Sequence, residues 1–186
     1  MIRSHLMSAA PPTLDAAQLR GLLARVGALA AKRGVELELV ALGGAAIALL
    51  FESRRVTRDI DIIDVRPSRE LLAELAAQIA REDALSPRWL SDEAARFARG
   101  VSKGRLLITA PGIRLYACSL EQLLASKLDA MRDDIDRSDA IRVAIELGLA
   151  RTSAELAIAP YLKPERYARA CEELADIWQE VEDARR

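Results

Sequence analysis

Two aspartates separated by a single residue, Asp59 and Asp61, have the spacing in this sequence that most directly indicates chemistry. In an extended strand, residues i and i+2 project from the same face, so the two carboxylates would repel each other. Such a pair is tolerated where it shares a divalent cation, or where it faces solvent at a strand end. Mg²⁺ binds one or two carboxylates together with water and substrate phosphates. The pair therefore predicts a Mg²⁺ site, with an exposed strand face as the alternative; Asp64 falls outside the series and is expected to face away.

Two adjacent glycines, Gly43 and Gly44, separate a strand-like segment over residues 36–42 from a short apolar segment over 45–51 that favours a helix. Glycines in such a turn allow a tight backbone and expose N–H groups beside the positive end of a helix, which suits a phosphate chain. Glycines also occur in strand-to-helix turns for steric reasons alone. By itself this pair is a weaker indication than the aspartates.

The hydrophobic periodicity predicts the elements that must position these residues. Alternation favours strands over 36–42, 59–65, 105–109 and 113–117, with Pro111-Gly112 as the turn of a hairpin between the last two. Spacings of three and four favour helices over 14–32, 45–51, 68–79, 91–99, 119–131, 140–147, 152–158 and 164–181. The order predicts an α+β fold, with a small mixed sheet, flanking helices and a helical C-terminal part. We expect a flexible leader over 1–13, a core over 14–118 and a helical part over 119–186 that packs on the core.

The composition of the 186 residues excludes several classes of function. His5 is the only histidine, which rules out a Ser-His-Asp triad and an HExxH zinc site. The net charge is -1, so bulk charge does not indicate a nucleic-acid partner. No apolar run approaches the roughly 20 residues of a membrane span, and the N-terminus lacks the apolar stretch of a signal peptide. A cytoplasmic protein with no membrane partner is expected.

Together, these motifs resemble the polymerase-β-type nucleotidyltransferase superfamily. The form Gly-Gly-x-Ala-x-x-Leu from Gly43, followed by Arg-x-Thr-x-Asp-x-Asp from Arg55, is similar to the bacterial AbiEii-type subset. The segment 123–132, with Lys127 and Arg132, and the Asp136-x-x-Asp139 motif resemble later parts of that subset. The resemblance covers about residues 35–147. Within the subset the chain is most similar to the MenT toxins of toxin–antitoxin pairs, which implies transfer of nucleotides from NTPs to the 3′ end of tRNA and a block of translation.

The resemblance implies a role for each matching residue. Gly43 and Gly44 would cradle the triphosphate, and Asp59 and Asp61 would hold Mg²⁺. Arg55 would contact the nucleotide phosphates, with Arg58 and Arg132 as further candidates for phosphate or RNA-backbone contacts.

The later segment would supply a cation and an acidic partner. Lys127 would reach the nucleotide phosphates, where a compact ammonium acts as a point charge. Asp136 or Asp139 would complete the acidic set and orient Lys127. Asp139 is favoured, because the helix over 140–147 is expected to follow it directly. An exposed helix lysine is the alternative for Lys127, but its position between Leu124 and Leu128 favours a functional role.

Thr57 lies two residues before Asp59, and the resemblance to MenT toxins implies that it is the target of phosphorylation by a cognate antitoxin protein. A phosphate adds a charge of about −1.5 to −2 beside carboxylates that must capture metal and triphosphate. A strand threonine without a regulatory role is the alternative.

Two features depart from the superfamily pattern. Ala45 stands where a hydroxyl residue often follows the glycines, and the strands expected over 105–109 and 113–117 contain no acid. The absent acid makes a second metal doubtful. Two alternative functions therefore stay open: a nucleotidyltransferase that acts on a small molecule or protein, and a non-catalytic nucleotidyltransferase-like binding module.

Overall fold

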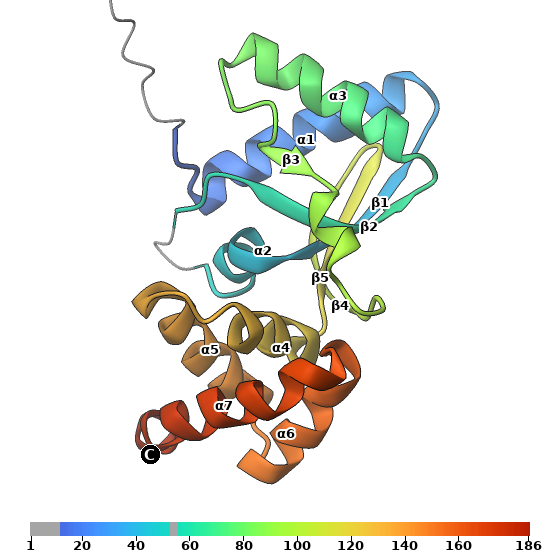
Figure 1. Cartoon of the computed structure of the whole chain (residues 1–186). Coiled ribbons are helices and arrows are strands. Elements are labelled where there is room, and N and C mark those ends of the chain that lie inside the picture. Colours follow the sequence, from blue (N-terminus) through green and yellow to red (C-terminus); the bar gives the residue numbers. More distant parts are fainter. Residues whose placement is uncertain (1–11, 53–55) are drawn as a thin grey trace, which may run out of the picture.

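A computed structural model describes residues 12–52 and 56–186 of the chain. Within these residues it contains a five-stranded mixed sheet and seven α-helices, with the last four helices gathered below the sheet in Figure 1. The expected α+β class is therefore confirmed. Residues 1–11 of the expected leader and the candidate phosphate ligand Arg55 lie outside the described residues.

The sheet has the strand order β3-β2-β1-β5-β4. Strand β1 lies in the centre, antiparallel to β2 and parallel to β5. The hairpin expected around Pro111-Gly112 is formed by antiparallel β4 and β5, and the short β3 pairs in parallel with β2 at the other edge. The strands are β1 (Leu37–Leu42), β2 (Ile60–Arg66), β3 (Leu90–Ser91), β4 (Lys103–Ala110) and β5 (Ile113–Cys118).

The helices fall into a group around the sheet and a group that follows it. The first group comprises α1 (Ala16–Lys32), α2 (Gly43–Leu50), α3 (Arg69–Glu82) and the 3₁₀ turn η1 (Glu93–Arg96). The second group comprises α4 (Leu120–Ala130), α5 (Asp134–Leu147), α6 (Arg151–Ile158), the 3₁₀ turn η2 (Ala159–Tyr161) and α7 (Pro164–Arg185). The helix expected over 91–99 is thus reduced to a 3₁₀ turn.

Helix α5 begins six residues before its expected start. The side chain of Asp133 accepts hydrogen bonds from the backbone N–H groups of Ile135 and Asp136, at 3.1 and 2.9 Å. This N-cap satisfies two donors that a helix start otherwise leaves unpaired. As a result, Asp136 and Asp139 lie in the first turns of the helix rather than before it.

Helix α1 packs tightly on one face of the sheet. A Cβ atom at Gly27 would lie only 2.4 Å from Cγ2 of Ile113, so the glycine allows the helix to approach β5. Helix α1 also contacts α3, and Figure 1 shows the two helices side by side along the sheet. This face carries Leu37 and Leu39, which are fully buried. One part of the hydrophobic core therefore lies between the sheet and these two helices, and the same cluster of buried residues continues through α2 and α4 to α7.

The opposite face carries Asp61 and also Asp64, and Asp64 lies there because β2 contains a β-bulge. Ala41 pairs with Ile62, whereas Val40 pairs with Asp64, so Ile63 is an extra residue in the strand. Paired residues of antiparallel strands share a face, and Val40 lies on the same face as Leu42, the partner of Asp61. The bulge thus brings Asp64 to the face of Asp61, and the expectation that Asp64 faces away is wrong.

The helices after the sheet pack against one another. Helix α4 contacts α5, α6 and α7, and it also reaches α2 on the sheet side. Among the described residues, no helix has the length and apolar character required to cross a membrane.

Candidate functional site

The site begins where β1 passes directly into α2. Gly43 has a φ of +72°, a conformation that side-chain-bearing residues rarely adopt. A Cβ atom at this position would lie 3.1 Å from Oδ2 of Asp61, so the backbone of Gly43 faces that carboxylate closely. The first N–H groups of a helix have no partner within the helix, and Leu42 at the N-cap position makes no side-chain cap. The Gly43-Gly44 turn therefore offers backbone donors next to an acidic side chain.

The two aspartates occupy the beginning of β2. Asp59 lies one residue before the strand and is exposed, whereas Asp61 lies within it and is half-buried. Burial raises the pKa of Asp61 above its ordinary value, and repulsion from Asp59 raises it further. The positive charges of Lys127 and Arg132 partly offset both effects. The pair is thus a concentration of negative charge that a cation would relieve.

The donor set fits a magnesium ion that arrives with phosphates. Mg²⁺ commonly binds through one or two carboxylates and keeps its other positions for water and substrate phosphates. Within the described part of the chain, no group of three or more His, Cys, Asp or Glu side chains is placed to hold a metal. Asp59 and Asp61 therefore fit a shared ion better than a site enclosed entirely by protein.

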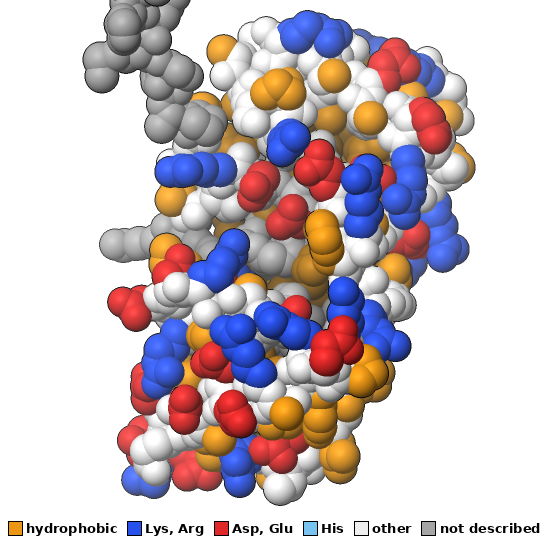
Figure 2. Space-filling model, viewed as in Figure 1, with side chains coloured by type: hydrophobic (Ala, Val, Ile, Leu, Met, Phe, Trp, Pro, Cys, Tyr) orange, Lys and Arg blue, Asp and Glu red, His pale blue; other side chains and the backbone are white. Residues whose placement is uncertain are grey.

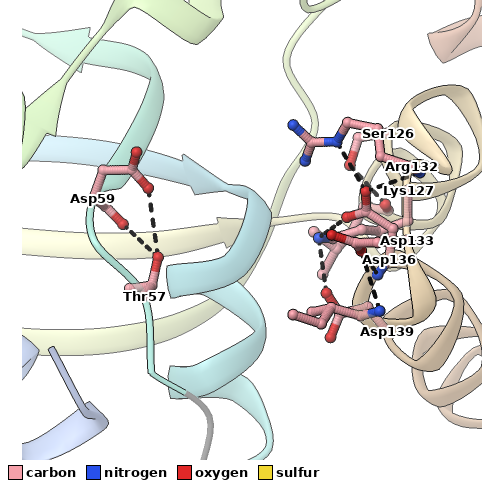
Figure 3. Close-up of polar contacts among 10 residues, drawn as sticks. Thr57, Asp59, Ser126, Lys127, Arg132, Asp133, Asp136 and Asp139 are labelled. Carbon is pink, nitrogen blue, oxygen red and sulfur yellow. Dashed lines mark hydrogen bonds and ion pairs between the residues drawn. The ribbon is translucent and has the colours of Figure 1, made fainter. Parts of the chain in front are cut away.

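Thr57 contacts Asp59 but is not part of β2. Its backbone forms an isolated bridge with Leu14 near the start of α1, with N–O distances of 2.6 and 2.9 Å. Its hydroxyl donates a hydrogen bond to the backbone oxygen of Asp59 at 3.1 Å and lies 3.4 Å from the carboxylate oxygen Oδ1 (Figure 3). A group added to this hydroxyl would lie beside the acidic pair.

The structure brings Lys127 together with both aspartates of α5. Nζ of Lys127 lies 2.9 Å from Oδ1 of Asp136 and 2.7 Å from Oδ2 of Asp139 (Figure 3). The three residues are between 2% and 6% exposed, so this is a buried triad with one more negative than positive charge. The sequence favoured Asp139 over Asp136 as the partner of Lys127. Both aspartates contact the lysine, so the geometry does not choose between them.

Asp136 is the more strongly held of the two carboxylates. Its Oδ2 atom accepts hydrogen bonds from Nε of Arg132 at 3.0 Å and from the backbone N–H of the same residue at 3.3 Å. Burial alone would raise the pKa of Asp136, but the hydrogen bonds from Arg132 and Lys127 outweigh it and lower the pKa to about 2. Asp136 therefore carries a charge throughout the physiological range.

The site consists of two clusters, the acidic pair Asp59 and Asp61 with Thr57, and the triad of Lys127, Asp136 and Asp139. These two clusters lie across from each other. Figure 3 shows Thr57 and Asp59 on the side of β2, with the Lys127 cluster on the helices opposite. The effect of Lys127 and Arg132 on the pKa of Asp61 means that their charges act on the acidic pair. In Figure 2, acidic side chains gather near the middle of this face, with Lys and Arg side chains above and below them.

A pocket of about 510 Å³ between α2 and α5 was not indicated by the sequence. It is lined by Ile47, Phe51, Asp134, Ile135, Ser138, Asp139 and Arg142. The guanidinium of Arg142 lies 5.0 Å from the centroid of the Phe51 ring, within the range of a cation–π interaction. Since Asp139 also binds Lys127, the pocket adjoins the buried triad. No sequence motif joins these residues, because only the packing of α2 against the later helices brings them together.

One comparison with known proteins gives a match. The model of a family described as "Nucleotidyltransferase of unknown function (DUF6036)" matches residues 17–149. Neither the curated proteins nor the solved structures contain a match to the chain. The matched range runs from α1 through α5 and so includes both clusters of the site.

Proposed function

Because the chain belongs to this family of nucleotidyltransferases, we propose that it is a Mg²⁺-dependent enzyme that transfers nucleotides from NTPs to the 3′ end of tRNA. The observation that carries the proposal is the close approach of the Gly43 backbone to the carboxylate of Asp61. It provides phosphate-binding donors and a metal-binding acid at one point. The resemblance to MenT toxins supports tRNA as acceptor and a role in blocking translation.

The reaction requires positioning and charge neutralisation rather than a covalent enzyme intermediate. A terminal ribose hydroxyl of the acceptor attacks the α-phosphorus in line, the bond to the β-phosphate breaks, and pyrophosphate leaves with the displaced electron pair. The hydroxyl proton is released to solvent. A bound Mg²⁺ would supply neutralisation of the phosphate charge. This chemistry needs no histidine, in agreement with the composition of the chain.

The residues of the site divide these tasks. Asp59 and Asp61 would hold Mg²⁺, while the N–H groups of Gly43 and Gly44 would bind the phosphates. Lys127 would contribute a positive charge from across the site, fixed by its two carboxylate partners.

The nucleoside of the incoming NTP would occupy the pocket between α2 and α5. Its volume lies within the usual range for small-molecule sites, and Ile47 follows Gly43 by about one helical turn. Arg55 stays a candidate phosphate ligand by resemblance alone, because it lies outside the described residues.

We further propose that the partner antitoxin acts at Thr57. The hydroxyl lies 3.4 Å from Oδ1 of Asp59, so a phosphate there would place additional negative charge beside the acidic pair. Metal and triphosphate binding would both weaken.

We propose that the chain is divided after residue 118 into a nucleotidyltransferase core and a helical C-terminal part. The family match crosses this boundary and ends two residues after α5. We therefore propose that α4 and α5 form part of the catalytic unit, even though they begin the helical C-terminal part.

The test is incubation of the protein with each labelled NTP and total RNA, in the presence of Mg²⁺. We expect label in the tRNA fraction and pyrophosphate release. Asp59→Ala is expected to abolish both, whereas the matched control Asp64→Ala should retain activity, because Asp64 lies farther along the same face and pairs with Arg66 at 3.2 Å. Label that appears in protein or in a small molecule would contradict the tRNA assignment, and activity of Asp59→Ala would contradict the site.

A further inference from the structure

One aromatic side chain beside the site is unusually exposed. Phe97, which directly follows η1, is 80% exposed, the highest value among the large hydrophobic residues of the described chain. The ring of Phe51, which lines the pocket between α2 and α5, is covered by the guanidinium of Arg142. The exposed ring leaves an aromatic face free to stack on a planar group.

Phe97 lines a pocket that extends from η1 to α4 and includes the last residue of β1. The pocket has a volume of about 200 Å³ and is also lined by Leu42 and Ser126. Leu42 pairs with Asp61 in the sheet, so one wall of the pocket lies beside the strand that carries this aspartate. The turn η1 itself packs against β2, and Glu93 is close enough to raise the pKa of Asp61. The turn that precedes Phe97 is therefore packed against the strand that carries Asp61.

The charges around Phe97 favour an anionic ligand. The chain runs Arg96-Phe97-Ala98-Arg99, and both arginines are exposed; the Arg99 guanidinium also donates a hydrogen bond to the backbone oxygen of Leu162 at 3.0 Å. Arg132, whose side chain is 75% exposed, follows α4 near the same pocket. Hydrophobic side chains lie exposed over η1 in Figure 2, next to the acidic patch and to basic side chains. An aromatic face between cationic groups is the arrangement that proteins use to bind single-stranded nucleic acid.

We propose that Phe97 is the stacking platform for the unpaired terminal base of the acceptor, with Arg96 and Arg99 binding the adjacent phosphates. The acceptor is then a nucleic acid with a single-stranded 3′ end, because a paired terminal base cannot place its face on the ring. This inference rests on the proposed function, since it assigns the acceptor of the same reaction. The NTP does not use Phe97, because its nucleoside occupies the separate pocket between α2 and α5.

The test measures binding separately from catalysis. The probe is a labelled RNA hairpin that ends in a short single-stranded 3′ overhang, and the comparison is the same hairpin with a blunt end. We expect fluorescence anisotropy to show tighter binding of the overhang. Phe97→Ala should weaken overhang binding at least about fivefold, the lower end for loss of one base–aromatic stack. Binding of the blunt hairpin should not change.

Substitutions at Phe97 distinguish stacking from general hydrophobic contact. Phe97→Leu keeps an apolar side chain but should bind the overhang as weakly as Phe97→Ala, whereas Phe97→Tyr should bind as the wild type does. Leu156→Ala is the matched control, because Leu156 is 73% exposed on α6 and should not affect binding. Equal binding of the overhang by the wild type and Phe97→Ala would overturn the proposal, as would wild-type binding by Phe97→Leu.

Three further outcomes separate this inference from the proposed function. An increased KM for NTP in Phe97→Ala, with unchanged RNA binding, would assign the ring to the donor nucleotide and overturn the inference. A wild-type protein that does not bind the overhang would also overturn it. If Asp59→Ala binds the overhang in a Phe97-dependent way, but the wild type transfers no nucleotide, the stacking platform stands and the proposed activity fails.

Discussion

Substitution of Lys127 by methionine is the sharpest test of how the buried triad is held together. Lys127, Asp136 and Asp139 have side chains that are 7%, 3% and 8% exposed, and the lysine Nζ lies within 2.9 Å of an oxygen of each aspartate. Methionine keeps an unbranched apolar stem of similar size, so little packing is lost. The variant therefore removes the charge and its hydrogen bonds while the surrounding core is retained.

The expected loss follows from what the substitution leaves behind. Asp136 keeps the hydrogen bonds from Arg132, whereas Asp139 loses the ammonium that lies 2.7 Å from it. A buried ion pair that loses one partner costs about 3–5 kcal/mol, because an uncompensated charge stays in a poorly solvated place. We expect the free energy of unfolding of Lys127→Met to fall by about this amount at pH 7. That is a large part of the ~5–15 kcal/mol typical of a domain.

The assay is denaturant-induced unfolding of the variant and the wild type. Arg151→Met is the matched control, because Arg151 forms an exposed i,i+4 pair with Glu155 at 3.3 Å. Such a pair contributes about 0.3–0.5 kcal/mol, so the control should be almost unchanged. A double variant that adds Asp139→Asn to Lys127→Met should recover part of the stability, since it removes one of the two buried negative charges that Lys127 offsets.

The pH dependence gives a second criterion. Without Lys127, the two buried aspartates carry negative charge that no ammonium offsets, so protonation of the folded state becomes more favourable and folding takes up a proton. The deficit of Lys127→Met should then become smaller as the pH falls from 7 towards the ordinary aspartate range. A loss below about 1 kcal/mol at pH 7, or a deficit that does not change with pH, would refute this account of the triad.

Three further predictions concern the rest of the site. Gly43→Ala should abolish transfer, because the new Cβ would press on Asp61. The control Gly34→Ala has a similar φ of +69° and open space around it, so it should cost only about 1–2 kcal/mol of stability and leave transfer intact. Equal activities of the two variants in the labelling assay would contradict the close approach of Gly43 to Asp61. Asp136 has a pKa lowered from 3.8 to about 2, so it should contribute about 2 kcal/mol of stability that is present above pH 4 and lost as the pH falls through 2; Asp136→Asn should remove this acid dependence in denaturant unfolding. Thr57→Glu should reduce transfer at least roughly tenfold while Thr57→Val retains it, and full activity of Thr57→Glu in the labelling assay would argue against control by charge at this position.

Much of the fold was predictable because its signals are local. Alternation identified β1 and β2, the Pro111-Gly112 turn identified the β4–β5 hairpin, and spacings of three and four identified the helices. The element boundaries were less certain. The start of α5 was missed because the capping role of Asp133 depends on hydrogen bonds to the backbone of Ile135 and Asp136, and the apolar pattern begins only later.

The prediction for Asp64 failed for a different reason. Strict alternation places it opposite Asp61, but the extra residue Ile63 reverses the facing of the strand after it. Ile62 and Ile63 are both buried, and nothing in a run of two isoleucines tells a bulge from regular pairing. Only the pairing of β2 with β1 determines that Asp64 lies on the same face of the sheet as Asp61.

By itself, the sequence determined which residue types are available for chemistry. It supplied two aspartates at strand spacing, a glycine turn, a lysine within an apolar helix and a single histidine, and these features already predicted phosphate and metal chemistry. The tertiary structure decided which of them meet. The closeness of Gly43 to Asp61, the sharing of Lys127 by two aspartates and the exposure of Phe97 all depend on how separate elements pack. Periodicity reports the environment along one element, whereas such contacts depend on how the elements pack on one another.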